Sequence, residues 1–110
     1  MSIGAANLVA TSDMWAYVAT IARRPDLAPI LADVLAEVAR AESIHPEWPD
    51  DVIHAAAVVS EESGELIQAA LQYRYESGDL ADVRTEALHT AATAIRLIAS
   101  LPNVKQEARP

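Results

Sequence analysis

The sequence predicts an all-α fold, an antiparallel bundle of about four helices. Three observations support this prediction: apolar residues recur at spacings of three and four, the chain holds only 3 Gly, and its prolines divide it into stretches of helical length. The 110 residues fit one domain spanning residues 1–110, with residues 1–11 and 103–110 expected to be flexible. Since the sequence contains no Phe, its core must consist mainly of aliphatic side chains.

Composition excludes several classes of protein. The net charge of −8 is opposite to what a nucleic-acid-binding surface needs. The absence of Cys excludes disulfides, thiolate metal sites and thiol nucleophiles. No apolar run reaches the roughly 18 residues of a membrane span, and no basic segment precedes the N-terminal apolar stretch. We therefore expect a soluble cytoplasmic protein that binds neither nucleic acid nor membranes.

The first half of the chain is predicted to form two helices and a loop. Ser12 is a suitable N-cap for a helix with an apolar stripe, which ends before Pro25. Pro29 favours the first turn of a second helix, which runs to about Ser43. Two prolines within residues 45–49 prevent the helix from continuing, so this segment is predicted to be a loop.

The second half is predicted to form two longer helices. Asp50 or Asp51 caps the third helix, which runs to about Ser77 and has Gly78 as its C-terminal cap. The fourth helix is predicted over residues 79–101. The short connection between them favours an antiparallel pair.

Three carboxylates occupy an unusual place in the third helix. Glu62 lies in the middle of its apolar stripe, and Glu65 and Glu61 lie at the edges. Residues at i and i+3 of a helix point the same way, so Glu62 and Glu65 can converge. These acids repel one another and lose hydration on burial, which indicates a compensating positive charge.

The fourth helix carries a matching pair, Glu86 and His89, again at i and i+3. An antiparallel arrangement brings this pair opposite Glu62 and Glu65. The resulting set of carboxylate oxygens and one imidazole favours Mg²⁺ or Mn²⁺ over Zn²⁺.

Two other interpretations of the acids remain open. They are consistent with a solvated helix face, or with the salt-bridge surface of an oligomer. A di-iron bundle uses the Glu-x-x-His pattern, but it needs two such helices and this chain has one. The second helix offers only Asp33, Glu37 and Glu42 as further ligands.

The run Glu61-Glu62-Ser63-Gly64-Glu65, followed by Glu86-x-x-His89, resembles a known signature. It is similar to the Glu-Glu-x-x-Glu … Glu-x-x-Asp pattern of the MazG-like all-α nucleoside triphosphate pyrophosphohydrolases, in particular the small bacteriophage-type members. The resemblance covers about residues 29–101. The chain departs from the pattern at His89, where the family usually has Asp.

The resemblance implies hydrolysis of a (deoxy)nucleoside triphosphate between its α and β phosphates, giving a monophosphate and pyrophosphate. It implies that Glu62, Glu65 and Glu86 bind Mg²⁺ or Mn²⁺, with His89 replacing the usual Asp. It also implies that Glu61 binds a further ion or accepts a proton from the attacking water. A non-catalytic helical interaction module that retains the acidic motif is the alternative.

Candidate substrate-binding residues lie near this motif. Trp48 and His45 are in the predicted loop, where the resemblance implies a nucleotide pocket and where a base could stack on the indole. Arg96 is favoured for the phosphates because it follows the ligand face of the fourth helix by about one turn. The alternatives are a core Trp and a surface Arg. A chain of this size buries a modest part of its surface, so we also expect a homodimer or homotetramer.

Overall fold

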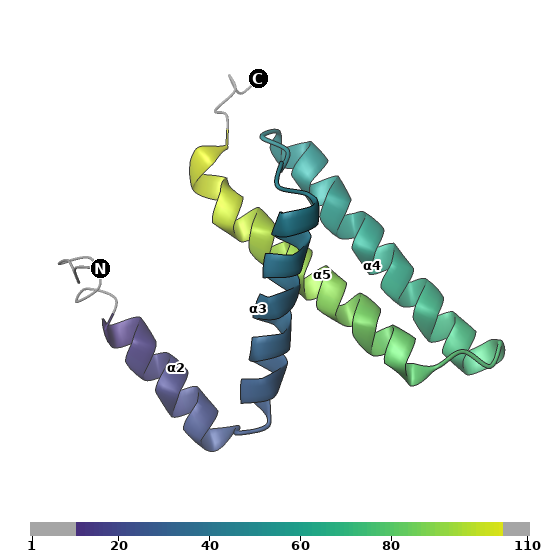
Figure 1. Ribbon diagram of the computed structural model, residues 1–110, viewed down its shortest axis with the longest axis horizontal. Coiled ribbons are helices and arrows are strands. Elements are labelled where there is room, and N and C mark those ends of the chain that lie inside the picture. The colour runs from purple at the N-terminus through teal and green to yellow at the C-terminus, as the bar shows by residue number, and fades with distance from the viewer. Residues whose placement is uncertain (1–10, 105–110) are drawn as a thin grey trace. The chain divides into compact units, whose positions relative to one another are not determined.

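The computed structural model describes residues 11–104, which form an all-α structure (Figure 1). Its elements are α2 (Thr11–Arg23), α3 (Leu27–Ile44), α4 (Val52–Tyr75), α5 (Leu80–Ser100) and a short 3₁₀ helix, η1 (Leu101–Asn103). The prediction of four α-helices is confirmed for this part of the chain. No helix within it is long and apolar enough to cross a membrane. The predictions for residues 1–10 and 105–110 lie outside the described residues.

The chain divides into two compact units, Met1–Ala32 and Asp33–Pro110. In the first unit, α2 begins at Thr11, so the predicted N-cap role of Ser12 is wrong. The helix α3 begins at Leu27, two residues before Pro29. Pro29 is tolerated there because the N–H groups of a first turn have no acceptor within the helix.

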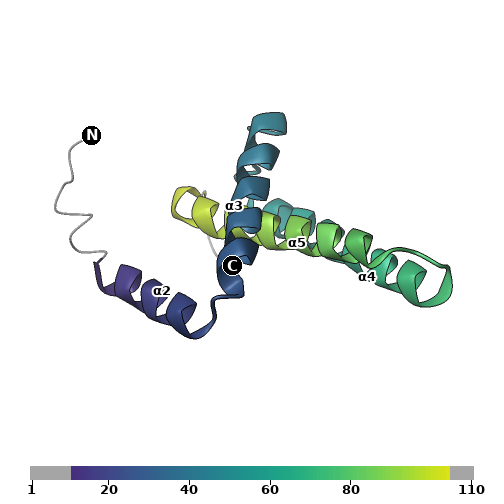
Figure 2. The same cartoon turned by 60° about the horizontal axis from the view of Figure 1, so that its bottom comes forward.

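In the second unit, α4 and α5 pack as an antiparallel pair, as the short connection predicted (Figure 1). The predicted aspartate cap of α4 is confirmed, because the Asp51 side chain accepts from the His54 N–H at 3.0 Å. At the start of α5, the Asp79 side chain accepts from the Ala81 N–H at 2.9 Å. The part of α3 from Asp33 onward does not extend this antiparallel arrangement. It crosses α5 steeply (Figure 2), and the Arg84–Asp33 ion pair joins the two helices at 2.7 Å.

The core of the described chain is thin and aliphatic. Its buried apolar side chains are Val34, Ala55, Ala69 and Ala92. Alanines at these positions allow α4 and α5 to lie close together, but they bury little apolar area. Many larger apolar side chains in residues 11–104 consequently remain exposed.

The turn between α4 and α5 differs from the prediction in detail. The helix α4 ends at Tyr75, and the left-handed residue is Ser77, with φ 60°, whereas Gly78 has no positive φ. A Cβ on Gly78 would lie 2.9 Å from backbone atoms of Gln72 and Tyr73. The glycine is therefore required by close approach of the backbone, which lets its N–H donate to the Gln72 carbonyl at 2.9 Å.

Candidate functional site

Glu62 of α4 and Glu86 and His89 of α5 form one group, which we call the Glu–Glu–His cluster. One potential ligand atom from each residue lies within 4.8 Å of the others. His89 Nδ1 is 3.3 Å from Glu86 Oε2 and 3.9 Å from Glu62 Oε2. The i, i+3 spacing on α5 and the antiparallel pairing with α4 bring these three side chains together, as the sequence predicted.

Two carboxylate oxygens of the cluster lack hydrogen-bond partners. Glu62 Oε2 and Glu86 Oε2 are buried and accept no hydrogen bond, a state that proteins normally avoid. Burial raises the pKa of Glu62, and the nearby charge of Glu65 raises it further. Two such oxygens beside an imidazole nitrogen form a donor set that fits Mg²⁺ or, because of the nitrogen, Mn²⁺.

A third carboxylate, from α3, joins this cluster. Glu37 Oε1 lies 3.3 Å from His89 Nε2. Arg40 donates to both Glu37 oxygens, from Nε at 2.8 Å and Nη2 at 2.5 Å, and this hydrogen bonding lowers the pKa of Glu37 against the effect of burial. From the sequence, Glu37 is a candidate ligand only for a di-iron site. The missed signal is its position three residues after Val34 and four before Ala41, which places it on the inward face of α3.

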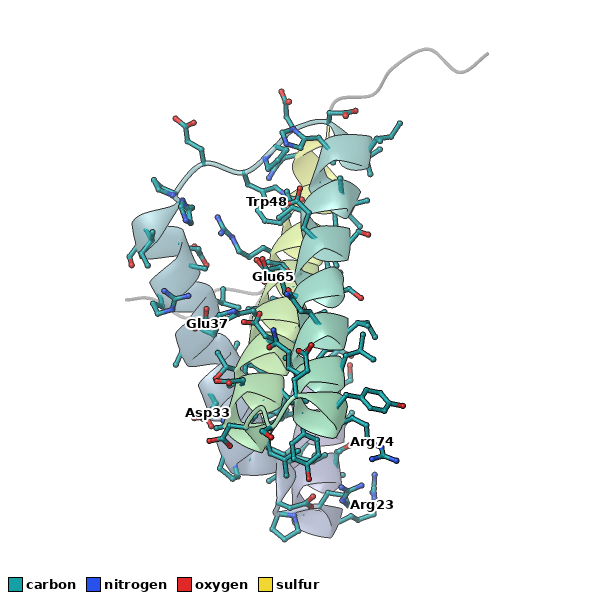
Figure 3. All side chains as sticks on the ribbon, turned by 90° about the vertical axis from the view of Figure 1, so that its right-hand side faces the viewer. Arg23, Asp33, Glu37, Trp48, Glu65 and Arg74 are labelled. Atoms are coloured by element: carbon teal, nitrogen blue, oxygen red, sulfur yellow. The ribbon has the colours of Figure 1, made fainter. Side chains whose placement is uncertain are left out.

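The cluster opens into a cavity of about 310 Å³ formed by α3, α4, α5 and the loop after α3. This volume lies within the range of small-molecule sites. The side chains in it that carry charge or aromatic surface are Glu37, Arg40, His45, Glu47, Trp48, Glu62, His89 and Arg96. In Figure 3 the labelled Glu37 lies on α3, and the labelled Trp48 lies at the loop that leads from α3 to α4.

The three predicted substrate-binding residues lie together at this cavity. The guanidinium carbon of Arg96 lies 4.8 Å from the centroid of the Trp48 ring, and Arg96 Nη2 donates to the His45 carbonyl at 2.7 Å. The indole Nε1 of Trp48 is buried without a hydrogen-bond partner. The Trp48 ring and the His45 carbonyl thus hold Arg96 in one orientation. The Trp48 Nε1–H remains available as a hydrogen-bond donor beside it.

The two remaining predicted residues lie outside the Glu–Glu–His cluster. Glu65 is exposed and lines a second cavity with Asp82 and Glu86, so Glu86 belongs both to the cluster and to this cavity. Glu61 is exposed and lines neither cavity. Glu65 nevertheless approaches Glu62, as predicted, because both its charge and a side-chain hydrogen bond between the two carboxyls raise the pKa of Glu62.

The cavity at the Glu–Glu–His cluster combines acidic and basic side chains around an aromatic ring. Carboxylates can hold a cation, whereas Arg40 and Arg96 can donate to an anion. This combination suits a phosphate-bearing ligand that binds together with a divalent cation. Comparisons of the chain with protein-family models, with curated proteins and with solved structures find no match.

Proposed function

We propose that this chain is a metal-dependent pyrophosphohydrolase that cleaves (deoxy)nucleoside triphosphates between the α and β phosphates. The observation that carries the proposal is that Glu62 Oε2 and Glu86 Oε2 are buried without a hydrogen-bond partner. They lie in one site with His89, and the cavity beside them holds two arginines and an indole ring. The resemblance of the acidic motif to the MazG-like signature supports the same reaction.

The residues divide between the metal and the substrate. Glu62, Glu86 and His89 would hold Mg²⁺ or Mn²⁺, with Glu65 as a further carboxylate next to Glu62. A bound divalent ion would neutralise part of the triphosphate charge and lower the pKa of a coordinated water. Arg96 would donate to phosphate oxygens.

Two further groups serve binding. The Arg40 side chain pairs with Glu37 but remains 53% exposed, so it can also donate to a second phosphate. The indole of Trp48 offers a surface on which a base can stack and an Nε1 donor that lacks a partner.

In the proposed reaction water attacks the α-phosphorus. The bond from that phosphorus to the oxygen bridging to the β-phosphate breaks, and pyrophosphate leaves with the electron pair. A carboxylate accepts the proton of the water. The resemblance assigns this role to Glu61, and Glu61→Gln tests the assignment because Glu61 is exposed and outside the cluster.

The test is product analysis. The full chain is incubated with each ribo- and deoxyribonucleoside triphosphate and Mg²⁺ or Mn²⁺, and products are separated by ion exchange. We expect equal amounts of monophosphate and pyrophosphate. Glu86→Gln should lower turnover by about 100-fold or more, whereas Glu76→Gln, an exposed acid at the end of α4, should leave it unchanged. Release of inorganic phosphate alone would contradict the proposal.

A non-catalytic helical interaction module is the second candidate function. The many exposed large apolar side chains of residues 11–104 favour it. No turnover of any nucleotide by chains with full helical circular dichroism would support this alternative and exclude the hydrolase.

A further inference from the structure

The outer surface of α4 carries a regular apolar pattern. Its residues alternate at spacings of four and three, the pattern of a helix that packs along its length against another helix. We call this set the α4 outer face; its members are Ile53, Ala57, Ser60, Gly64, Ile67 and Leu71. All six are exposed, because the buried Ala55 and Ala69 lie on the opposite side of the helix, where α5 packs.

Large apolar side chains at the two ends of this face are unusually exposed. Ile53 is 77% exposed, Ile67 59% and Leu71 52%. Together with the helical spacing, these fractions mark a continuous apolar surface rather than isolated exposed residues.

The middle of the face is formed by small residues. Gly64 lies in the interior of α4, where a glycine is less favourable than alanine by about 1 kcal/mol. Nothing lies within 4 Å of a Cβ built on Gly64, so packing within the chain does not require a glycine there. With Ser60 one turn away, the position permits close approach of a second helix backbone.

The order of residues makes the face self-complementary. Positions 53 and 71, positions 57 and 67, and positions 60 and 64 all share the midpoint 62. If two copies of α4 run antiparallel about a two-fold axis at this midpoint, Ile53 meets Leu71, Ala57 meets Ile67, and Ser60 meets Gly64. The large side chains then pack together at the ends, and the backbones cross at the small ones.

Charge complementarity supports the antiparallel direction. An antiparallel pair brings the last turn of α4, which carries Arg74, beside the N-terminal end of α4 in the second copy, which Asp50 and Asp51 precede. Within residues 11–104, Arg74 forms no ion pair and lies against the ring of Tyr75, with Cζ 5.3 Å from its centroid. A parallel pair would instead place Arg74 beside Arg74 and leave Asp50 beside Asp50, which is unfavourable.

We therefore infer that the α4 outer face binds a second copy of this chain, as an antiparallel, two-fold symmetric α4–α4 pair. This surface is opposite the Glu–Glu–His cluster on α4, so pairing leaves the proposed active site accessible. The inference does not depend on the proposed activity.

Light scattering coupled to size exclusion tests the pairing. The full chain should have twice the 11.8 kDa mass of one copy. Ile67→Glu and Leu71→Glu each place a charge in the interface and should weaken the dimer by about tenfold or more. Ile98→Glu, at an equally exposed isoleucine on α5, is the matched control and should keep the dimer mass. Circular dichroism verifies that each variant remains helical.

Cysteine cross-linking tests the direction, because the chain contains no natural Cys. Chains with Ala57→Cys and chains with Ile67→Cys are oxidised separately and as a mixture. The mixture should form far more disulfide-linked dimer than either variant alone. A wild-type mass of 11.8 kDa, or equally efficient cross-linking of each variant with itself, would overturn the inference.

Discussion

Arg96 on α5 lies over the ring of Trp48, with its Cζ 4.8 Å from the ring centroid, and it also donates to the carbonyl of His45 at 2.7 Å. One side chain therefore connects α5 to the start and the middle of the short loop that separates α3 from α4. Because a guanidinium group is planar, it can stack on the indole and donate within its plane at the same time. The position of the loop at the cavity therefore depends on the contacts of Arg96 with Trp48 and His45.

Arg96→Lys should disturb that loop, because an ammonium group retains the charge but cannot stack and donate in the same manner. We expect the free energy of unfolding to fall by about 1 kcal/mol and KM for the nucleotide to rise by about tenfold. The indole is monitored by fluorescence in a Trp15→Phe background, where Trp48 is the only tryptophan. Unchanged Trp48 emission and unchanged stability in Arg96→Lys would show that the contact does not position the loop.

Glu62 should destabilise the metal-free fold at neutral pH. Burial and the charge of Glu65 raise its pKa in the folded chain above the unfolded value. Below the unfolded pKa both states are protonated and this carboxyl has no effect on stability; as pH rises through the folded pKa, the folded state loses stability relative to the unfolded state.

Glu62→Gln should remove this loss. The difference in unfolding free energy between Glu62→Gln and the natural chain should grow in favour of the variant as pH rises from about 4 to 7. Urea unfolding in the presence of EDTA measures it, while turnover of the same variant should fall by about 100-fold or more. A difference that is constant with pH would contradict this account.

His89 should set the choice of metal if it is a direct ligand. An imidazole nitrogen suits Mn²⁺ better than Mg²⁺, which prefers oxygen. We expect the ratio of kcat/KM with Mn²⁺ to that with Mg²⁺ to fall in His89→Asp. His89→Ala distinguishes ligation from packing, and the same ratio in all three proteins would mean that His89 does not contact the metal.

The turn between α4 and α5 contains one position where a substitution should stabilise the chain. Ser77 adopts a left-handed conformation with φ 60°, which is unfavourable for residues with a Cβ. Ser77→Gly should raise the free energy of unfolding by up to about 1 kcal/mol, after the greater freedom of glycine in the unfolded chain is included. Gly78→Ala should lower it, because the new Cβ would lie 2.9 Å from the backbone of Gln72 and Tyr73. In thermal unfolding, Ser77→Gly should therefore raise the melting temperature and Gly78→Ala should lower it.

The helical pattern predicted the helices, the aspartate cap of α4, and the meeting of Glu62 with Glu86 and His89. These features depend on local rules: the helical period, side-chain capping of a first turn, and the i, i+3 geometry combined with a short connection. Local rules also identified Trp48, His45 and Arg96 as neighbours of the motif. They did not identify the left-handed residue of the turn, since a serine there is unfavourable and is maintained by the surrounding backbone.

The contribution of α3 to the site depends on tertiary packing. Where α3 crosses α5 depends on how side chains of both helices pack, and no spacing within one helix specifies it. That crossing brings Glu37, with its partner Arg40, to 3.3 Å from His89. The tertiary structure also placed Glu65 at a second cavity with Asp82 and Glu86, because a residue at the edge of a helix face can border either of two cavities. Sequence period defines the faces of a helix, whereas the packing of its neighbours defines what each face contacts.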